Sequence, residues 1–427
     1  MSSALRSFMR LRGRSAFTGS TLNRPLPRSP QAIRALTTTI RWDQGELLLR
    51  SQKDQEVVVR KIPQLWLRDN CRCTECVNQD TMQRNFNTFE ISMNISARAL
   101  ETNEDGFDVL WSDWHKSTYT WSWLRSLVHR DPSKVLNRIH GSRFWNHSIA
   151  SNPPEVSYQS VMDKCNNAGM AELTNKIRNY GLCFVIDTPK TPEATKQLLE
   201  AIGPIRNTHY GGFYDFVPDL AKADTAYTNL ALAAHTDTTY FTEPAGLQAF
   251  HLLSHEPPPG EAQEESLGGQ SLLVDGFQAA HRLRLEHPEA YEILRTVRVP
   301  WHASGNKDVA IAPDKGYAVI ETSSRRLFRI RWNNDDRGVI PLRADVDKWY
   351  AAARTWDSIL RRKKNQYWFQ LTPGRVLIFD NWRVLHGRRA FEGQRRICGG
   401  YINQDDFISR WKTSNFPRDE VIAANIS

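Results

Sequence analysis

A histidine and an aspartate two residues apart follow an apolar run near the middle of the chain. The segment from Tyr227 ends in His235-Thr-Asp237, and residues two apart on a strand project to the same face, so both side chains can hold one ion. His386 follows a second apolar run, which begins at Val376, and supplies a third ligand from another strand. Two histidines and one carboxylate make the facial triad that leaves positions on iron(II) open for a bidentate co-substrate and oxygen.

A different metal could use the same ligand types. Catalytic zinc is also bound by two histidines and a carboxylate, but the His-Glu-x-x-His helix motif of zinc hydrolases is absent from the sequence. An isolated His-x-Asp is more often a surface turn, so the interpretation depends on the surrounding residues.

Three cysteines are bunched at Cys71, Cys73 and Cys76. One tight turn is too cramped for disulfides between them but suits zinc, which takes thiolates as ligands. A fourth ligand is then required, and His115 is the nearest downstream histidine. Such a zinc has no open position and is structural. Three free cysteines, or a redox Cys-x-x-Cys without the usual βαβ surroundings, are the alternatives.

The elements that must position these residues follow from the apolar pattern. Short apolar runs separated by turns from Ile40 to about Val128 predict a small β-rich domain. Helical spacing predicts that a helix over 121–136 closes it. Glycine and proline residues predict a linker over 137–154.

A barrel is predicted downstream of that linker. Helices are expected over 157–180 and 192–202, and many short strand-like runs follow. Runs at this spacing predict a double-sheet barrel, that is, a mainly β fold with flanking helices. The strand-like runs are Leu182–Ile186, Gly246–Leu253, Gly269–Val274, Tyr317–Glu321 and Gly374–Phe379, and the two further helices are 277–287 and 345–362. The stretch 256–268, rich in proline and glutamate, predicts a hairpin loop.

The positive charge of the chain is concentrated at its start. Residues 1–41 hold eight arginines and neither lysine nor acidic residues, so the net charge of +9 falls to about +1 without them. Arg6, Arg10 and Arg14 would line one side of a helix, as in a mitochondrial transit peptide, and we expect a location in the mitochondrial matrix. A basic arm that binds nucleic acid is the alternative. No apolar run reaches the roughly 20 residues of a membrane span.

Five strings carry a family resemblance that extends from about Arg41 to Phe407. They are His209-Tyr-Gly-Gly, Ala226-Tyr-Thr-Asn, Ala234-His-Thr-Asp-Thr-Thr-Tyr-Phe, Leu273-Val-Asp-Gly-Phe and Phe379-Asp-Asn-Trp-Arg-Val-Leu-His-Gly-Arg. These strings resemble the γ-butyrobetaine/trimethyllysine dioxygenase family, and within it the members that act on trimethyllysine. The resemblance implies a double-stranded β-helix (jelly-roll) catalytic domain preceded by a small β-rich zinc-binding domain, with His115 as the fourth zinc ligand.

The resemblance also implies an activity. Members of the family use iron(II), O2 and 2-oxoglutarate, and the implied reaction hydroxylates C3 of N6,N6,N6-trimethyllysine as succinate and CO2 form, which opens carnitine biosynthesis. Ascorbate is expected from the family alone. Hydroxylation of γ-butyrobetaine by the same chemistry is the alternative. It is disfavoured by Asp224 and by the pair Thr238-Thr239. A zinc-containing binding protein with a vestigial barrel is a third interpretation, which the complete triad disfavours.

The distal carboxylate of 2-oxoglutarate requires a buried cation, ideally a guanidinium that donates two parallel hydrogen bonds. Arg395 matches the family's position when the segment 395–401 is aligned on its tyrosine. Arg396 is the alternative, because neighbours on a strand point in opposite directions. Arg388 and Arg389 are interpreted as surface or structural residues.

A trimethylammonium group cannot donate hydrogen bonds, so aromatic faces are expected around it. The tyrosines that match the family's cage are Tyr210, Tyr214, Tyr227 and Tyr401, and related sequences carry a tryptophan at the second of them. A single tyrosine near a strand can also serve only in packing, since aromatic residues favour strands.

Two further residues address the rest of the substrate. Asp224 could pair with the α-ammonium group of trimethyllysine, because a buried carboxylate and an ammonium offset each other's desolvation; a helix cap or loop aspartate is the alternative. Asn333 matches a family residue that contacts the substrate carboxylate, and Asn334 would replace it after a slip of one residue.

The sequence thus predicts four segments. We expect a transit peptide at 1–41, a zinc-binding domain at 42–136, a linker at 137–155 and the iron(II)/2-oxoglutarate dioxygenase domain at 156–427. We expect a small-molecule substrate rather than nucleic acid or a membrane as partner, and we allow for a homodimer.

Overall fold

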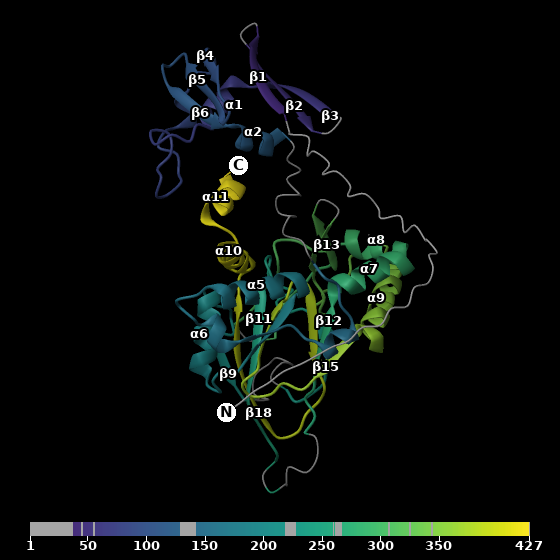
Figure 1. Cartoon of the computed structure of the whole chain (residues 1–427). Helices are drawn as coiled ribbons and strands as arrows, with labels where there is room; N and C mark the ends of the chain where they lie inside the picture. The colour runs from purple at the N-terminus through teal and green to yellow at the C-terminus, as the bar shows by residue number, and fades with distance from the viewer. Residues whose placement is uncertain are drawn as a thin grey trace, which may run out of the picture. The chain divides into compact units, whose positions relative to one another are not determined.

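The computed structural model describes residues 37–43, 46–53, 56–128, 142–217, 228–258, 260, 267–305, 308–323, 326–342 and 345–426. The chain divides into unit 1, Met1–His129, and unit 2, Arg130–Ser427, whose helices and strands are labelled in Figure 1. Each unit contains a hydrophobic core of its own. No helix among the described residues is long and apolar enough to cross a membrane.

Unit 1 is β-rich, as predicted, with two three-stranded antiparallel sheets. Burial alternates along its strands because successive side chains point to opposite faces, and Phe107, Val109 and Trp111 face the core. Its strands are β1 (Thr37–Asp43), β2 (Glu46–Lys53), β3 (Glu56–Ile62), β4 (Ala97–Thr102), β5 (Gly106–Trp111) and β6 (Lys116–Thr120), and its helices are α1 (Gln64–Asp69), η1 (Thr88–Glu90) and α2 (Trp121–Val128). The predicted extension of α2 to residue 136 lies outside the described residues.

Unit 2 contains the double-sheet barrel that the strand pattern predicted. One sheet has six strands in the order β7-β8-β16-β11-β18-β9, and the other has four in the order β10-β17-β12-β15. The six are β7 (Glu155–Ser157), β8 (Leu182–Ile186), β16 (Val376–Asp380), β11 (Leu247–Glu256), β18 (Gln394–Ile402) and β9 (Tyr214–Phe216), and the four are β10 (Leu232–His235), β17 (Val384–Arg388), β12 (Ser271–Asp275) and β15 (Gln366–Phe369). Phe184, Leu252 and Phe379 of the first sheet pack with Leu273 and Tyr367 of the second, so an apolar core fills the barrel.

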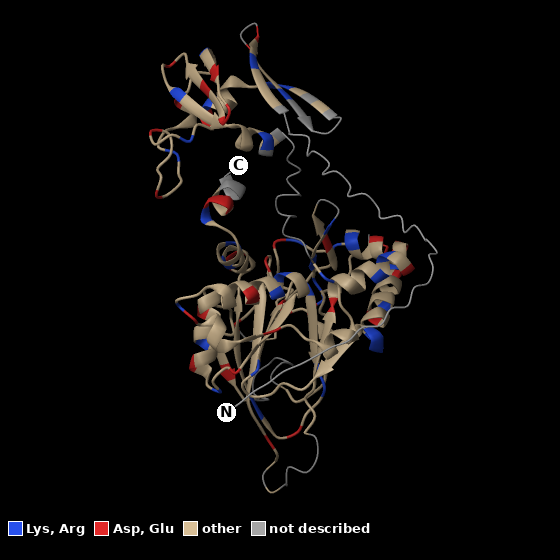
Figure 2. Ribbon diagram, viewed as in Figure 1, with Lys and Arg blue, Asp and Glu red and all other residues tan. Residues whose placement is uncertain are grey.

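Helices cover the outer faces of both sheets. The six-stranded sheet packs against α5 (Ala168–Tyr180), α6 (Pro192–Ile202) and α10 (Gln404–Asn415), and the four-stranded sheet against α7 (Gly276–Glu286), α8 (Pro288–Thr296) and α9 (Val346–Leu360) (Figure 1). Most charged residues of unit 2 lie on these helices and on loops rather than on the barrel strands (Figure 2). The remaining elements are α4 (Tyr158–Val161), the hairpin of β13 (Ile320–Ser323) and β14 (Arg326–Ile330), α11 (Arg418–Ile426), η2 (His147–Ser151) and η4 (Lys363–Asn365).

Two predicted elements differ in the structure. The helix expected over 157–180 is interrupted between α4 and α5, where the side chains of Asp163 and Asn166 accept hydrogen bonds from the amides two residues on and offer the backbone an alternative to the helix. The stretch 256–268 was predicted as a hairpin loop, and this was wrong. It joins β11 to β12, which belong to different sheets and do not pair with each other.

The boundaries of the units also differ from the expected segments. β1 begins at Thr37, so residues 37–41 of the expected transit peptide belong to a strand. Part of the expected linker is packed on unit 2, because Trp145 is buried in the barrel core and its amide donates to Asp275 at 3.1 Å. Burial of a large aromatic side chain stabilises the fold, so Trp145 holds this segment against the barrel.

Candidate active site

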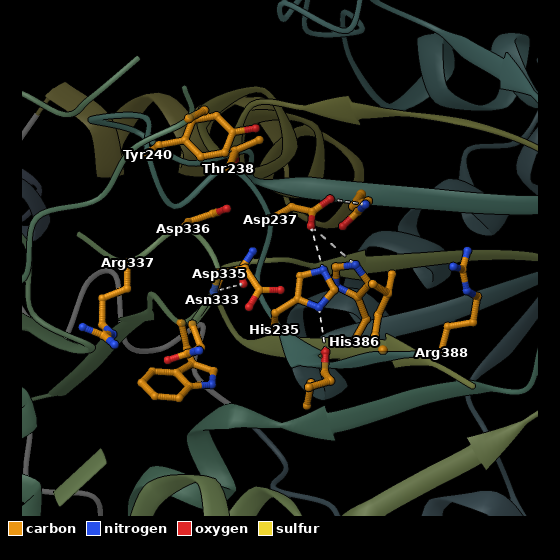
Figure 3. A pocket seen from close by; sticks show the side chains of 18 of the residues that line it. His235, Asp237, Thr238, Tyr240, Asn333, Asp335, Asp336, Arg337, His386 and Arg388 are labelled. Carbon is orange, nitrogen blue, oxygen red and sulfur yellow. Dashed lines mark hydrogen bonds and ion pairs between the residues drawn. The ribbon is translucent and has the colours of Figure 1, made fainter. Parts of the chain in front are cut away.

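His235 and His386 lie opposite each other on neighbouring strands. β10 ends at His235, whose backbone pairs with that of His386 on β17. Asp237 follows two residues later, and its Oδ1 lies 3.2 Å from His235 Nε2 and 3.6 Å from His386 Nε2 (Figure 3). The ligand atoms of the three side chains lie within 4.8 Å of one another, close enough to hold a single metal ion.

The second carboxylate oxygen of Asp237 is held from the other sheet. Gln248 Nε2 on β11 donates to Asp237 Oδ2 at 2.6 Å, and the hydroxyl of Tyr401 on β18 donates to it at 2.7 Å. Burial alone would raise the pKa of the Asp237 carboxyl, but His386, His235 and the Tyr401 hydroxyl together hold it well below its ordinary value. Asp237 is therefore an anion whose Oδ1 faces the two imidazoles.

Both imidazoles direct Nε2 toward that oxygen. His235 Nδ1 lies 2.8 Å from the carbonyl oxygen of Ala233, which can only accept, so in the neutral ring Nδ1 carries the proton and Nε2 the lone pair. Burial and the adjacent His235 lower the pKa of His386 to about 3. Burial, the largest single influence, lowers the pKa of His235 as well, but the hydrogen bond and charge of Asp237, the Ala233 carbonyl and the charge of Asp336 together raise it above its ordinary value, so a proton and a metal ion compete for Nε2. This donor set fits iron(II).

The loop after Asp237 is fixed by buried polar contacts. Thr238 adopts a φ of 54°, a left-handed backbone conformation that is rare for a β-branched residue, and its hydroxyl accepts a hydrogen bond from the Ala245 amide at 2.8 Å. Arg331 is fully buried and donates to the carbonyl oxygen of Phe241 at 2.7 Å. A strained backbone persists where its surroundings over-determine it, so these contacts fix the position of the carboxylate ligand.

The three side chains open into a cavity of about 1030 Å³. Its walls come from both sheets, from the loop after β14 and from α9. The predicted site residues that line it are Tyr210, Tyr214, His235, Asp237, Asn333, His386, Arg395 and Tyr401. This volume accommodates a co-substrate and a substrate together, since single-ligand sites measure roughly 300–1,000 Å³.

Arg395 and Arg396 point to opposite sides of β18. Arg395 is 5% exposed, lines the cavity, and its Nε has no hydrogen-bond partner among the described residues. Burial, with Arg388 nearby, lowers the pKa of Arg395 to about 9. Arg396 is exposed and forms an ion pair with Asp215 at 2.6 Å. Arg388 is buried at the cavity wall and donates to the carbonyl oxygen of Leu230 at 3.0 Å, a structural contact.

Three of the four predicted cage tyrosines border the cavity. The ring centroids of Tyr214 and Tyr401 lie 6.1 Å apart in an edge-to-face arrangement, and the ring of Tyr210 contacts that of His209 at 3.8 Å. The fourth, Tyr227, lies outside the described residues, as does Asp224.

The structure brings both predicted asparagines to the cavity. Asn333 and Asn334 lie in the loop after β14 and line its wall. Asn333 Oδ1 accepts a hydrogen bond from the Asp335 amide at 3.0 Å, which fixes its side chain, whereas Asn334 is exposed. Figure 3 shows Asn333 and Asp335 drawn beside His235.

Comparison with known proteins covers both units. The family model for the taurine catabolism dioxygenase TauD, TfdA family matches residues 146–401, and the one for the gamma-butyrobetaine hydroxylase-like N-terminal region matches residues 37–125. A trimethyllysine dioxygenase of Neurospora crassa is 55% identical over 84% of this chain and 82% of that protein. The human mitochondrial trimethyllysine dioxygenase is 38% identical over 82% of each chain. The chain belongs to the trimethyllysine dioxygenase family.

More distant proteins match at lower identity. A gamma-butyrobetaine dioxygenase of Pongo abelii is 26% identical over 82% of this chain and 89% of that protein. The crystal structure of a taurine dioxygenase from Burkholderia xenovorans aligns with a TM-score of 0.43 and 14% identity, over 58% of this chain and 86% of that one. Membership of the trimethyllysine dioxygenase family confirms the resemblance seen in the sequence, and with it a TauD-type dioxygenase with a double-stranded β-helix.

Unit 1 carries a second group of potential metal ligands. Cys71, Cys73 and Cys76 follow α1, and their Sγ atoms lie 3.3, 3.6 and 3.4 Å from Nε2 of His115, in the turn between β5 and β6. The four ligand atoms lie within 4.8 Å of one another. Three sulfurs around one imidazole nitrogen match the donor set of a four-coordinate zinc.

Arg68 stands beside this cysteine cluster. It is 8% exposed, donates from Nη1 to Cys76 Sγ at 3.4 Å, and pairs through Nε with Asp113 at 3.1 Å. The Asp113 carboxylate also accepts a hydrogen bond from the His115 amide at 3.0 Å. Arg68 thus joins the cysteine turn to the turn that carries the histidine.

Gln248 is the site residue that the sequence analysis missed. It lies within the apolar run predicted as a strand, and it shares a face of β11 with Phe250 and Leu252, both of which pack in the barrel core. A lone amide at an inward position of an apolar strand was the available signal, because a buried polar group requires a partner.

Proposed function

We propose that this protein hydroxylates C3 of N6,N6,N6-trimethyllysine, with O2 and 2-oxoglutarate as co-substrates and 3-hydroxy-trimethyllysine, succinate and CO2 as products. The observation that carries the proposal is the cluster of His235, Asp237 and His386 at a large cavity, in a member of the trimethyllysine dioxygenase family. These three residues would hold iron(II), which when bound supplies O2 activation coupled to the decarboxylation of 2-oxoglutarate.

Arg395 would bind the distal carboxylate of 2-oxoglutarate. Its guanidinium is nearly buried, and its Nε has no hydrogen-bond partner among the described residues. A buried charge without a partner costs free energy, so a ligand anion that pairs with it is stabilised. Arg396 is a weaker candidate, since Asp215 already neutralises it outside the cavity.

The tyrosines would hold the trimethylammonium group of the substrate. Tyr210, Tyr214 and Tyr401 border the same cavity as the metal ligands, and aromatic faces attract a weakly hydrated cation. Tyr227 would complete the cage, Asn333 would contact the substrate carboxylate, and Asp224 would pair with the α-ammonium group.

The proposed reaction is tested by coupled product measurement. Purified protein with iron(II) should release CO2 from 2-oxoglutarate faster with trimethyllysine than without it, and mass spectrometry should find one oxygen atom added to trimethyllysine. Omission of ascorbate should lower turnover, as expected for the family. Faster turnover of γ-butyrobetaine than of trimethyllysine would instead support the alternative reaction, and no substrate-dependent CO2 release would contradict both.

A structural zinc in unit 1 is the second part of the proposal. Cys71, Cys73, Cys76 and His115 would fill four tetrahedral positions and leave none open for substrate. The contact of Arg68 with Cys76 supports it, because three thiolates and one zinc carry a net negative charge that a guanidinium offsets.

The third part of the proposal is a location in the mitochondrial matrix. The arginine-rich residues 1–41 support it, and the human, mouse and bovine relatives are named as mitochondrial proteins. A fusion of residues 1–41 to a fluorescent reporter should enter mitochondria, and a diffuse cytosolic signal would contradict this. Because β1 begins at Thr37, a fusion of residues 1–36 should be imported equally well.

A further inference from the structure

We infer that Gln248 and Tyr401 act as a clamp that restricts Asp237 to binding the metal through one carboxylate oxygen. Both donate to Asp237 Oδ2, at 2.6 and 2.7 Å, while Oδ1 faces the two imidazoles. Gln248 and Tyr401 are thus positioning residues for the metal ligand. The inference rests on the iron site proposed above.

The strand register places the two donors side by side. Gln248 on β11 is directly opposite Tyr401 on β18, and facing residues on adjacent strands are near enough for their side chains to reach one target. Asp237 follows β10, a strand of the other sheet. The clamp therefore spans the barrel, and the six-stranded sheet positions a ligand that the four-stranded sheet carries.

Two donors saturate the oxygen that they contact. A carboxylate oxygen has about two lone-pair sites, and on Oδ2 of Asp237 the Gln248 amide and the Tyr401 hydroxyl fill both. Only Oδ1 then has lone pairs directed at a metal held by His235 and His386. A carboxylate that bound through both oxygens would take up one more position on the metal, and the reaction requires open positions for the 2-oxo acid and for O2.

The orientation of the Gln248 amide supports this assignment. Its Nε2 faces the carboxylate, which can only accept, while its Oε1 is buried and has no hydrogen-bond partner among the described residues. Gln248 is 2% exposed and Tyr401 is 7% exposed. An unpaired buried oxygen is unfavourable and calls for an explanation, and the contact with Asp237 supplies one.

Metal binding without substrate tests the clamp directly. Wild-type protein freed of active-site metal but still holding the zinc proposed for unit 1 should bind one Mn²⁺ per chain, and His235→Ala should abolish that binding. In Gln248→Leu and in Tyr401→Phe, which each remove one donor, the Kd for Mn²⁺ should rise by roughly 10- to 100-fold, the usual effect of removing a partner of a metal ligand. The absorption spectrum of the Co²⁺ form should also shift, because an additional carboxylate oxygen enters the coordination sphere.

Matched controls come from β15, outside the cavity lining. Gln366→Leu and Tyr367→Phe make the same chemical changes in the other sheet, and they should leave the Kd for Mn²⁺ and the Co²⁺ spectrum unchanged even if they lower the Tm. Gln248→Asn, which keeps the amide on a shorter side chain, replaces Gln248→Leu if the latter fails to fold.

The outcomes separate the clamp from the proposed function. Wild-type Mn²⁺ affinity and an unchanged Co²⁺ spectrum in folded Gln248 and Tyr401 variants would overturn the clamp alone. A change in only one of the two variants would overturn the joint action and leave a single positioning residue. A wild-type protein that binds no metal at His235 would overturn the proposed function and the clamp together.

Discussion

The two groups of potential metal ligands in this chain are built in opposite ways. In unit 1, three ligands lie within the turn of Cys71, Cys73 and Cys76, and His115 completes a closed set of four. In unit 2, His235 and His386 come from strands that are distant in sequence but paired in the barrel, and both side chains line a cavity of about 1030 Å³.

Under the proposed function, this difference would separate a structural site from a catalytic one. Three thiolates and an imidazole fill all four positions of a tetrahedral metal, whereas three ligands leave positions open for substrates. The closed set joins two turns of a small unit, and Arg68 and Asp113 add a second connection between them. The open set, that is, His235, Asp237 and His386, depends on the barrel for its geometry, since Gln248 and Tyr401 hold the Asp237 carboxylate from the opposite sheet.

The largest effect is expected from breaking the open set. His235→Ala, Asp237→Ala and His386→Ala should each lower turnover below detection while circular dichroism shows a folded protein, because the proposed iron would lose one of its three protein ligands. Metal analysis should find that iron is lost and zinc is retained. Full activity in any of the three variants would rule out the iron assignment.

Breaking the closed set should affect stability instead. Cys73→Ser should lower the free energy of unfolding by roughly 4 kcal/mol or more, the size associated with loss of a structural metal, and it should abolish zinc binding. Chemical denaturation and metal analysis measure the two effects. Cys165→Ser is the matched control, since Cys165 is exposed and outside the cluster. Wild-type protein that is stable and active without zinc would contradict the prediction.

Turnover at the cavity beside the three ligands should also depend on Arg395, which lines it. Arg395→Met should raise the KM for 2-oxoglutarate by roughly 150-fold or more, because two charge-assisted hydrogen bonds are lost, at about 1.5–3 kcal/mol each. Arg396→Met, on the opposite face of β18 and paired with Asp215, should leave this KM unchanged. Steady-state kinetics with both variants decide between the two arginines, and the reverse result would exchange their roles.

The smallest predicted effect concerns substrate choice. Asp224→Asn should weaken the binding of trimethyllysine by about 1.5–3 kcal/mol, since it removes one charge-assisted hydrogen bond to the α-ammonium group. The kcat/KM for trimethyllysine should then fall roughly 10- to 150-fold. γ-Butyrobetaine, which lacks that group, should lose nothing. Tyr210→Ala should by contrast weaken the binding of both substrates, because each presents the same trimethylammonium cation to the tyrosine cage. An equal loss for both substrates in Asp224→Asn would make this carboxylate structural.

Much of the fold was predictable because its signals are local. α6 begins and ends as its sequence predicts: Thr191 caps its first turn, Pro192 occupies the first position, and Gly203 follows its end. Strands β8, β12 and β16 were located by their apolar runs. The assignment of 256–268 to a hairpin failed for a non-local reason, because pairing partners depend on topology that a loop's composition does not encode.

The sequence by itself identified most of the side chains that the structure brings together as potential metal ligands in both units. Cys71, Cys73 and Cys76 are near enough along the chain to share one ion, and the spacing of His235 and Asp237 on an extended segment places both side chains on one face. These inferences need only residue chemistry and the period of a strand. The third ligand, His386, required the family resemblance or a paired strand to connect it to the others.

Only the tertiary structure decided which faces of the strands point into the barrel. Side chains alternate along β18, so Arg395 and Tyr401 share one face of the strand and Arg396 lies on the other. Which of these faces is inside the barrel is determined by the packing of the two sheets. The same is true of Gln248, whose function depends on the register that sets it opposite Tyr401 and within reach of Asp237. Register and sheet packing arise from contacts between distant segments, and a single sequence does not contain those distances.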